Sequence, residues 1–146
     1  MEDHAAENQI VEGMLDEWKR GMLPYWTLGL LLQRDMYGYE IKKEIELSTA
    51  GRIRLGVSTM PQLLRRLESK KLVESHWEAS SHGPRRAYYQ ITPAGKAVLK
   101  AYIQQVLSPN SPIYHAISAL TANIFQELAG FEYTSLSDND QEKGSI

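Results

Sequence analysis

The stretch Leu55–Thr92, LGVSTMPQLLRRLESKKLVESHWEASSHGPRRAYYQIT, decides the fold, and its first part predicts an amphipathic helix. Ser58 is a good N-cap residue, and Pro61 falls in the first turn, where its missing N–H costs no hydrogen bond. Apolar residues recur at helical spacing along one side, namely Met60, Leu63, Leu64 and Leu67. The opposite side carries Ser58, Gln62, Arg65 and Ser69, with Thr59 and Arg66 on one flank.

Two short strands joined by a basic turn are predicted after this helix. In residues 72–79 and 87–92 the side chains alternate with a period of two, which is typical of half-buried strands. The residues between them, SSHGPRR, supply turn formers and then Arg85 and Arg86. A helix followed by a hairpin with a basic tip is the winged helix-turn-helix arrangement.

This arrangement predicts a surface that reads DNA. Gln and Arg side chains can make the paired hydrogen bonds that distinguish bases in the major groove, and wing arginines can reach phosphates or the neighbouring minor groove. Taken alone, the helix favours the interpretation as an ordinary amphipathic surface helix, and the hairpin that follows it reverses this in favour of DNA binding. We expect contacts to DNA from Ser58, Thr59, Gln62, Arg65, Arg66, Ser69, Lys70, Arg85 and Arg86.

The distribution of charge agrees with this expectation. The whole chain of 146 residues carries a net charge of −2. Residues 51–100 hold ten basic and three acidic residues, a net charge of +7, whereas residues 1–20 carry −4 and residues 131–146 carry −3. A basic centre between acidic ends is expected of a protein that meets a polyanion with one face.

Composition excludes several other classes of protein. With 42% hydrophobic and 23% charged residues the chain suits one globular domain, and no apolar run is long enough to span a membrane. The start of the chain lacks the layout of a signal peptide, so we expect a cytoplasmic protein. There is no cysteine, and His4, His76, His82 and His115 lack metal-ligand spacing, so we expect no metal, no cofactor and no enzyme activity.

Helices are predicted on both sides of the winged helix, giving a mainly α (α+β) protein. Residues 1–21 form an N-terminal helical arm, in which an amphipathic helix over residues 5–20 ends at Gly21. Residues 22–92 form the winged helix domain, beginning with a buried helix from Leu23 to Gln33 that has Pro24 in its first turn. A second helix starts near Tyr37, and residues 52–55, RIRL, could add a third strand beside the hairpin.

Residues 93–129 predict C-terminal dimerisation helices. One is capped by Thr92 and runs from Pro93 to about Leu107, and SPNSP separates it from another that Ser111 starts. The last helix carries an apolar seam of Ile113, Ile117, Leu120, Ile124 and Leu128. The apolar stripes of the terminal helices are most simply buried in a two-fold homodimer. The polar residues 130–146 are expected to be a disordered tail.

Three stretches resemble the PadR-like transcriptional regulators, which are dimeric winged-helix proteins found mostly in bacteria. They are YGYEI (37–41), LLRRLESKKLVESHWE (63–78) and GPRRAYYQITPAGK (83–96), within a resemblance that covers roughly residues 23–107. The resemblance implies that the third core helix and the wing bind DNA and that the terminal helices dimerise. Thr59, Arg65 and Arg66 match positions of the family's helix, and Arg85 and Arg86 match its wing.

Some features depart from the family pattern. Pro61 and Gln62 stand where members usually carry a Tyr-Pro pair, so the DNA contact of that tyrosine is not carried over. The preceding residues, GVS, replace the usual Ser-Pro-Gly. The added N-terminal helix, short C-terminal region and polar tail are similar to those of a cyanobacterial, clock-associated member.

The sequence therefore predicts a regulator that binds double-stranded DNA, a dimeric repressor reading a two-fold related operator. The alternative is a ligand-responsive regulator, since some relatives bind flat aromatic compounds between subunits. Trp18, Trp26 and Tyr102 could line such a site, or they could simply pack in the core or the dimer seam. A winged helix used only for protein contacts is a third possibility, against which the +7 centre argues.

Overall fold

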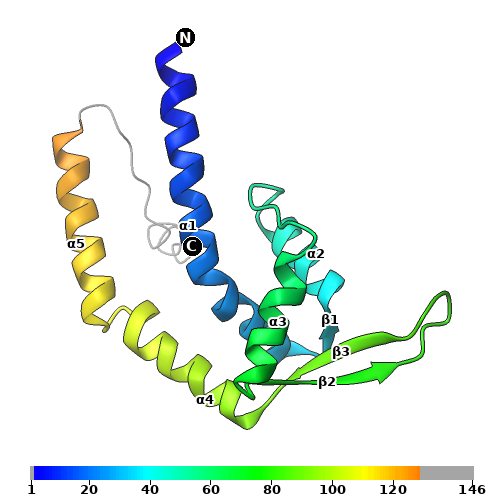
Figure 1. Ribbon diagram of the computed structural model, residues 1–146. Helices are drawn as coiled ribbons and strands as arrows, with labels where there is room; N and C mark the ends of the chain where they lie inside the picture. Colours follow the sequence, from blue (N-terminus) through cyan, green and yellow to red (C-terminus); the bar gives the residue numbers. More distant parts are fainter. Residues whose placement is uncertain (1, 129–146) are drawn as a thin grey trace, which may run out of the picture. The chain divides into compact units, whose positions relative to one another are not determined.

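The computed structural model describes residues 2–128, with side chains from residue 4, as helices and a small antiparallel sheet (Figure 1). The elements are α1 (Glu2–Gln33), β1 (Met36–Tyr37), α2 (Gly38–Ser48), α3 (Thr59–Ser69), β2 (Val73–Glu78), β3 (Arg86–Ile91), α4 (Pro93–Tyr102), the π-helix η1 (Ile103–Leu107) and α5 (Pro112–Glu127). The chain forms two compact units, Met1–Tyr102 and Ile103–Ile146. Within the described residues, no helix combines the length and the hydrophobicity that crossing a bilayer requires.

The first unit has the predicted winged helix fold. Its sheet has the order β1-β3-β2, with both pairs antiparallel, and the β2–β3 hairpin runs in register from Val73↔Ile91 to Glu78↔Arg86. α3 precedes this hairpin, as the sequence predicts. Val73 at the base of the hairpin is buried while Trp77 near its tip is 65% exposed, so only the base belongs to the core.

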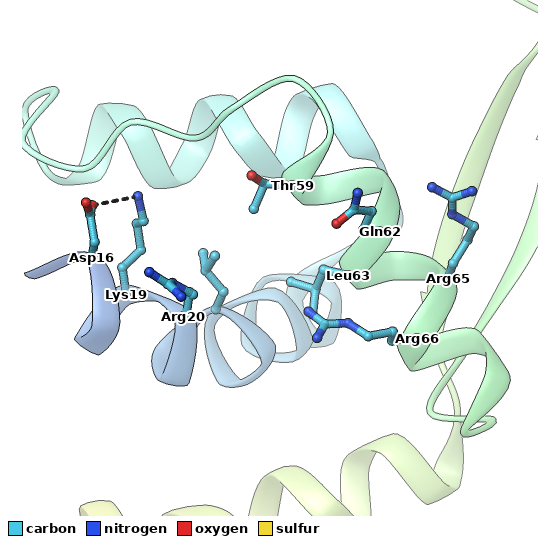
Figure 2. Close-up of a pocket in the computed structure, with 9 residues that line it drawn as sticks. Asp16, Lys19, Arg20, Thr59, Gln62, Leu63, Arg65 and Arg66 are labelled. Atoms are coloured by element: carbon cyan, nitrogen blue, oxygen red, sulfur yellow. Dashed lines mark hydrogen bonds and ion pairs between the residues drawn. The ribbon is translucent and has the colours of Figure 1, made fainter. Parts of the chain in front are cut away.

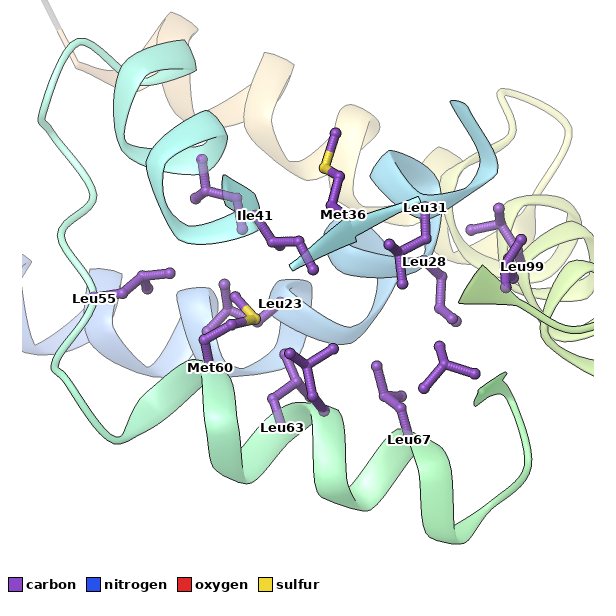
Figure 3. Close-up of a cluster of buried hydrophobic side chains, with 14 of the residues drawn as sticks. Leu23, Leu28, Leu31, Met36, Ile41, Leu55, Met60, Leu63, Leu67 and Leu99 are labelled. Atoms are coloured by element: carbon purple, nitrogen blue, oxygen red, sulfur yellow. The ribbon is translucent and has the colours of Figure 1, made fainter. Parts of the chain in front are cut away.

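The buried side of α3 fixes how the helix presents its other side. Met60, Leu63, Leu64 and Leu67 are each less than 5% exposed, and they pack with residues from α1, α2 and both long strands (Figure 3). Burying one such side chain contributes on the order of 1.5–3 kcal/mol, so rotating α3 about its axis would be costly. The hydrophobic core therefore holds the polar residues of α3 toward solvent.

The predicted break between two helices at Gly21 is wrong. α1 continues through Gly21 and through Pro24, which lies inside the helix. A proline there removes a backbone hydrogen bond, but Leu23, Thr27 and Leu28 are buried around it, and their packing holds the helical path. The N-terminal segment thus extends the first core helix directly. The division of the chain into domains at residues 21 and 92 stays a prediction.

The predicted third strand is also misplaced. Residues 52–55 form no strand, and the free edge of β3 is instead taken by β1, with Met36 opposite Tyr89 and Tyr37 opposite Tyr88. The segment before Arg52 turns through left-handed backbone at Ala50 and Gly51. It then runs beside α1, where Arg52 pairs with Glu12 at 2.8 Å between Nη1 and Oε1.

The predicted helix caps are confirmed at two of three positions. Thr92 Oγ1 accepts a hydrogen bond from the backbone N–H of Gly95 at 3.0 Å, and Ser111 Oγ accepts from those of Ile113 and Tyr114. Ser58 precedes α3 as expected, but its backbone is already helical and its side chain makes no cap hydrogen bond. The helix predicted to run to Leu107 ends as α4 at Tyr102 and is followed by η1.

In the second unit, α5 has no buried residue, and the predicted apolar seam is exposed. Ile117 and Leu120 are each 61% exposed, and Ile113 and Ile124 are nearly half exposed. Leu128 lies just beyond the helix as its C-cap residue. The tail predicted to be disordered, residues 130–146, lies outside the described residues.

Candidate nucleic-acid interface

The exposed face of α3 carries most of the residues that the sequence singles out. Ser58, Gln62, Arg65 and Ser69 are exposed on the side opposite the core, and Lys70 is exposed directly after the helix. Nε of Arg65 donates to the carbonyl oxygen of Pro61 at 3.3 Å, and the hydroxyl of Ser69 donates to that of Arg66 at 2.8 Å. The side-chain amide of Gln62 and the terminal nitrogens of Arg65 face solvent as hydrogen-bonding groups.

A groove of about 760 Å³ separates one flank of α3 from α1 (Figure 2). We call it the α1–α3 groove. Thr59, Gln62, Leu63, Arg65 and Arg66 form one wall, and Asp16, Lys19, Arg20 and Leu23 form the other. Four basic side chains thus meet one acidic side chain. The groove thus brings the predicted residues Thr59, Gln62, Arg65 and Arg66 together. It adds two cations that the sequence did not single out, Lys19 and Arg20.

Lys19 and Arg20 were missed because they lie in a segment with a net negative charge. The signal that could have found them is their spacing with Asp16 and Leu23 at i, i+3, i+4 and i+7, which marks one helix face. That signal has a meaning only if the helix continues past Gly21, as it does in α1.

The hairpin lies on the other flank of α3. The hydroxyl of Ser75 in β2 donates to Oε1 of Glu68 in α3 at 2.7 Å, which ties the two elements together. Arg85 is exposed just before β3, whereas the guanidinium of Arg86 stands over the ring of Tyr37 at 4.5 Å. The two wing arginines are therefore not equivalent, because the cation–π contact holds Arg86 against Tyr37 of β1.

A second pocket, of about 370 Å³, lies between α2, the start of α3 and β3. Its lining includes Tyr37, Tyr39, Pro61 and Tyr89, with Lys42 and Arg86 also present. Burial raises the pKa of Tyr89, and nearby Glu68 raises it further while Arg65 opposes the change. The phenol therefore stays protonated at neutral pH and keeps its capacity to donate a hydrogen bond.

The histidine and carboxylate side chains are dispersed in the described part of the chain. Within residues 4–128, no three His, Asp or Glu side chains are grouped so that they could hold a metal ion. His76 instead pairs with Glu78 at 3.0 Å between Nε2 and Oε1, and its ring stacks on Tyr88. The arrangement offers positive charge and hydrogen-bonding groups on an exposed helix.

Comparison with known proteins gives consistent matches. The model of the transcriptional regulator PadR-like family matches residues 27–101, about half of the chain. A PadR family transcriptional regulator from Eggerthella lenta is 30% identical, with a TM-score of 0.63 over 83% of this chain and 96% of that one. A PadR-like transcriptional regulator from Bacillus cereus is 27% identical, with a TM-score of 0.57 over 75% and 97%. An uncharacterized protein X from Lysinibacillus sphaericus is 37% identical over 59% of this chain and 79% of that protein.

Proposed function

The chain belongs to the PadR-like family of transcriptional regulators, and we propose on this premise that it binds a two-fold related DNA operator as a homodimeric repressor. The observation that carries the proposal is the exposed polar face of α3, held outward by four buried residues on its other side. A helix presented in this way can enter the major groove with its polar side chains toward the base edges.

The exposed residues divide into two kinds of DNA contact. Gln62 and Arg65 have the side chains that read bases through paired hydrogen bonds. Arg66, Lys70 and Arg85 are cations suited to phosphates, which supply affinity without sequence preference. The hairpin beside α3 would place Arg85 and Arg86, which both lie at its turn end, against the DNA backbone or the neighbouring minor groove.

The proposal of a homodimer rests on exposed apolar residues of the terminal helices. Ile10, Val11, Met14 and Trp18 are more than half exposed on α1, and the seam of α5 is exposed as well. A soluble monomer rarely leaves such series uncovered, and a second copy would bury them. A two-fold dimer would set two α3 helices about 34 Å apart, and a bound dimer would block a promoter.

Selection of bound fragments from random duplex DNA tests this function. The purified protein should enrich a motif with two inverted half-sites whose centres are about 10 base pairs apart or a multiple of that. Recovery of no preferred sequence would remove sequence-specific regulation, and recovery of a single asymmetric site would remove the two-fold dimer.

A ligand-responsive regulator is the second candidate. Trp26 packs against the core, and Tyr102 stacks on Tyr25 with ring centroids 5.4 Å apart, so both aromatics are engaged within the protomer. Trp18 is half exposed and free to meet a flat ligand at a subunit interface. Titration with a panel of aromatic cations should quench the fluorescence of Trp18 and weaken operator binding over the same range of ligand concentration. Unchanged fluorescence would count against a sensor.

A clock role is a narrower proposal still. Its support is the similarity of the terminal segments to those of the cyanobacterial clock regulator called period extender. Deleting the gene should then change the period of a rhythmically expressed reporter. An unchanged period beside a deregulated operator would leave the DNA-binding function and remove the clock role.

A further inference from the structure

Besides Arg65, whose Nε donates to the carbonyl oxygen of Pro61, the α1–α3 groove is lined by two further guanidinium groups, those of Arg20 and Arg66. Arg20 on α1 and Arg66 on α3 are both exposed, and neither forms an ion pair with a carboxylate in the described part of the chain. Figure 2 shows Arg66 extending from α3 toward α1, on which Arg20 lies. Two cations left facing one concave surface create a positive potential that attracts an anion.

Lys19 is the fourth cation of the groove, and its position is fixed. Its side chain is only 19% exposed, and its Nζ donates to Oδ1 of Asp16 at 3.2 Å and to the carbonyl oxygen of Arg54 at 3.3 Å. These contacts attach α1 to the segment leading into α3, and the Glu12–Arg52 ion pair lies one helical turn further along. The α1 wall is therefore a positioned part of the groove.

The place of the groove relative to the reading face identifies the anion. In Figure 1, α3 lies between α1 and the β2–β3 hairpin. Thr59 and Arg66 of α3 line the groove on the α1 side, and Glu68 accepts a hydrogen bond from Ser75 of the hairpin. A helix lying in the major groove, which is about 12 Å wide, has a phosphate backbone on each side. With α3 in the major groove, the hairpin would lie near one backbone and the α1–α3 groove near the other.

We propose that the α1–α3 groove binds a backbone phosphate of duplex DNA, with Arg20 of α1 as a DNA-contacting residue opposite Arg66. This inference rests on the proposed function and extends it to a segment outside residues 27–101, to which the family match is confined.

Salt-dependent binding by the variant Arg20→Ala tests the inference. Arg20 is exposed and alanine favours helix, so the variant should fold, which circular dichroism checks. Fluorescence anisotropy would measure its binding to the selected operator and to an unrelated duplex over a range of KCl concentrations. We expect both affinities to fall by a similar factor, roughly three- to tenfold, and the slope of log K against log salt to become shallower by about 0.9.

Two further variants separate a specific contact from a general loss of charge. Arg20→Lys keeps a cation in the groove and should restore the slope. Lys100→Ala removes an exposed cation of α4 that does not line the groove, and it should leave affinity and slope unchanged.

Several outcomes would overturn the inference. The inference fails if Arg20→Ala binds both duplexes like the wild type, or if Lys100→Ala loses as much affinity as Arg20→Ala does. It also fails if Arg20→Ala loses affinity for the operator alone, which would indicate base reading. If these occur while Arg65→Ala still weakens operator binding, the inference alone fails. If the wild-type protein binds neither duplex, the proposed function fails with it.

Discussion

Arg65 lies on the exposed face of α3, and we propose that base reading depends on it more than on any other residue. Helical periodicity placed it there from the sequence, together with Ser58, Gln62 and Ser69, since four buried apolar residues define the opposite side. The same reasoning could not find Arg20. Its importance depends on a contact surface between two helices, which no local pattern contains.

Replacing Arg65 by Ala should weaken binding to the selected operator by about 1–3 kcal/mol and relax the preference at one base pair. The physical reason is the loss of a paired hydrogen bond to one base edge. Gel-shift titrations against operators with single base-pair changes measure both effects. Unchanged discrimination at every position would show that Arg65 reads no base.

Arg85 and Arg86 should behave differently from Arg65. Arg85→Ala should weaken all duplexes evenly, because an exposed cation contacts phosphates. Arg86→Ala should in addition lower the free energy of unfolding by about 0.5–1 kcal/mol, since it removes the cation–π contact with Tyr37. Urea unfolding measures the stability of each variant, and fluorescence anisotropy measures its affinity for DNA. If the two variants are equally stable, the expected stabilising role of the Arg86–Tyr37 contact is contradicted.

At the scale of elements, the sequence predicts the helices, strands and caps that have a local pattern. It does not predict the elements whose form depends on tertiary packing. α3, the hairpin and the Thr92 cap each carry a period or a cap residue, and all are present. β1 is two residues long, too short to show a period, so the third strand was placed elsewhere. Gly21 signals a helix end and Pro24 a helix start, but the buried residues around Pro24 outweigh both signals and α1 continues through them.

The continuity of α1 predicts that Gly21→Ala stabilises the protein by roughly 0.5–1 kcal/mol, because Gly21 lies inside a helix and an added Cβ would meet nothing within 4 Å. Denaturant unfolding with helix content followed by circular dichroism measures this. A loss of stability would instead indicate the left-handed helix end that the sequence alone suggested.

Gly95→Ala should do the opposite. Gly95 is buried in α4, and an added Cβ would overlap the carbonyl oxygen of Leu72 and approach Cγ1 of Ile91 within 2.8 Å. Because the clash is partly with backbone, α4 must shift away from the hairpin, and we expect a loss of at least about 1–3 kcal/mol. Gly29→Ala, with nothing within 4 Å, is the matched control and should not destabilise the protein.

At the scale of the whole molecule, the basic centre coincides with the helix and hairpin of the winged helix, while the terminal helices carry exposed apolar residues. The sequence locates the basic region correctly, because the net charge of a stretch can be counted from its residues. The surface that a partner covers is not determined by one chain, so the homodimer remains a proposal.

Ile117→Glu should convert the dimer to a monomer without unfolding it, because a charge would replace an apolar residue of the α5 seam that is 61% exposed in one chain. Analytical ultracentrifugation should then report a mass near 16.6 kDa instead of twice that value. Ser118→Glu adds the same charge to α5 away from the seam and should leave the dimer intact. A dimeric Ile117→Glu protein would show that α5 is not the interface.

The central claim, that the exposed face of α3 reads DNA sequence, is tested most directly by the ratio of affinities for the selected operator and a shuffled duplex. For Gln62→Ala with Arg65→Ala in one chain, the ratio should fall toward one while salt-dependent binding to both duplexes persists. A double variant that prefers the operator as strongly as the wild type would contradict the claim.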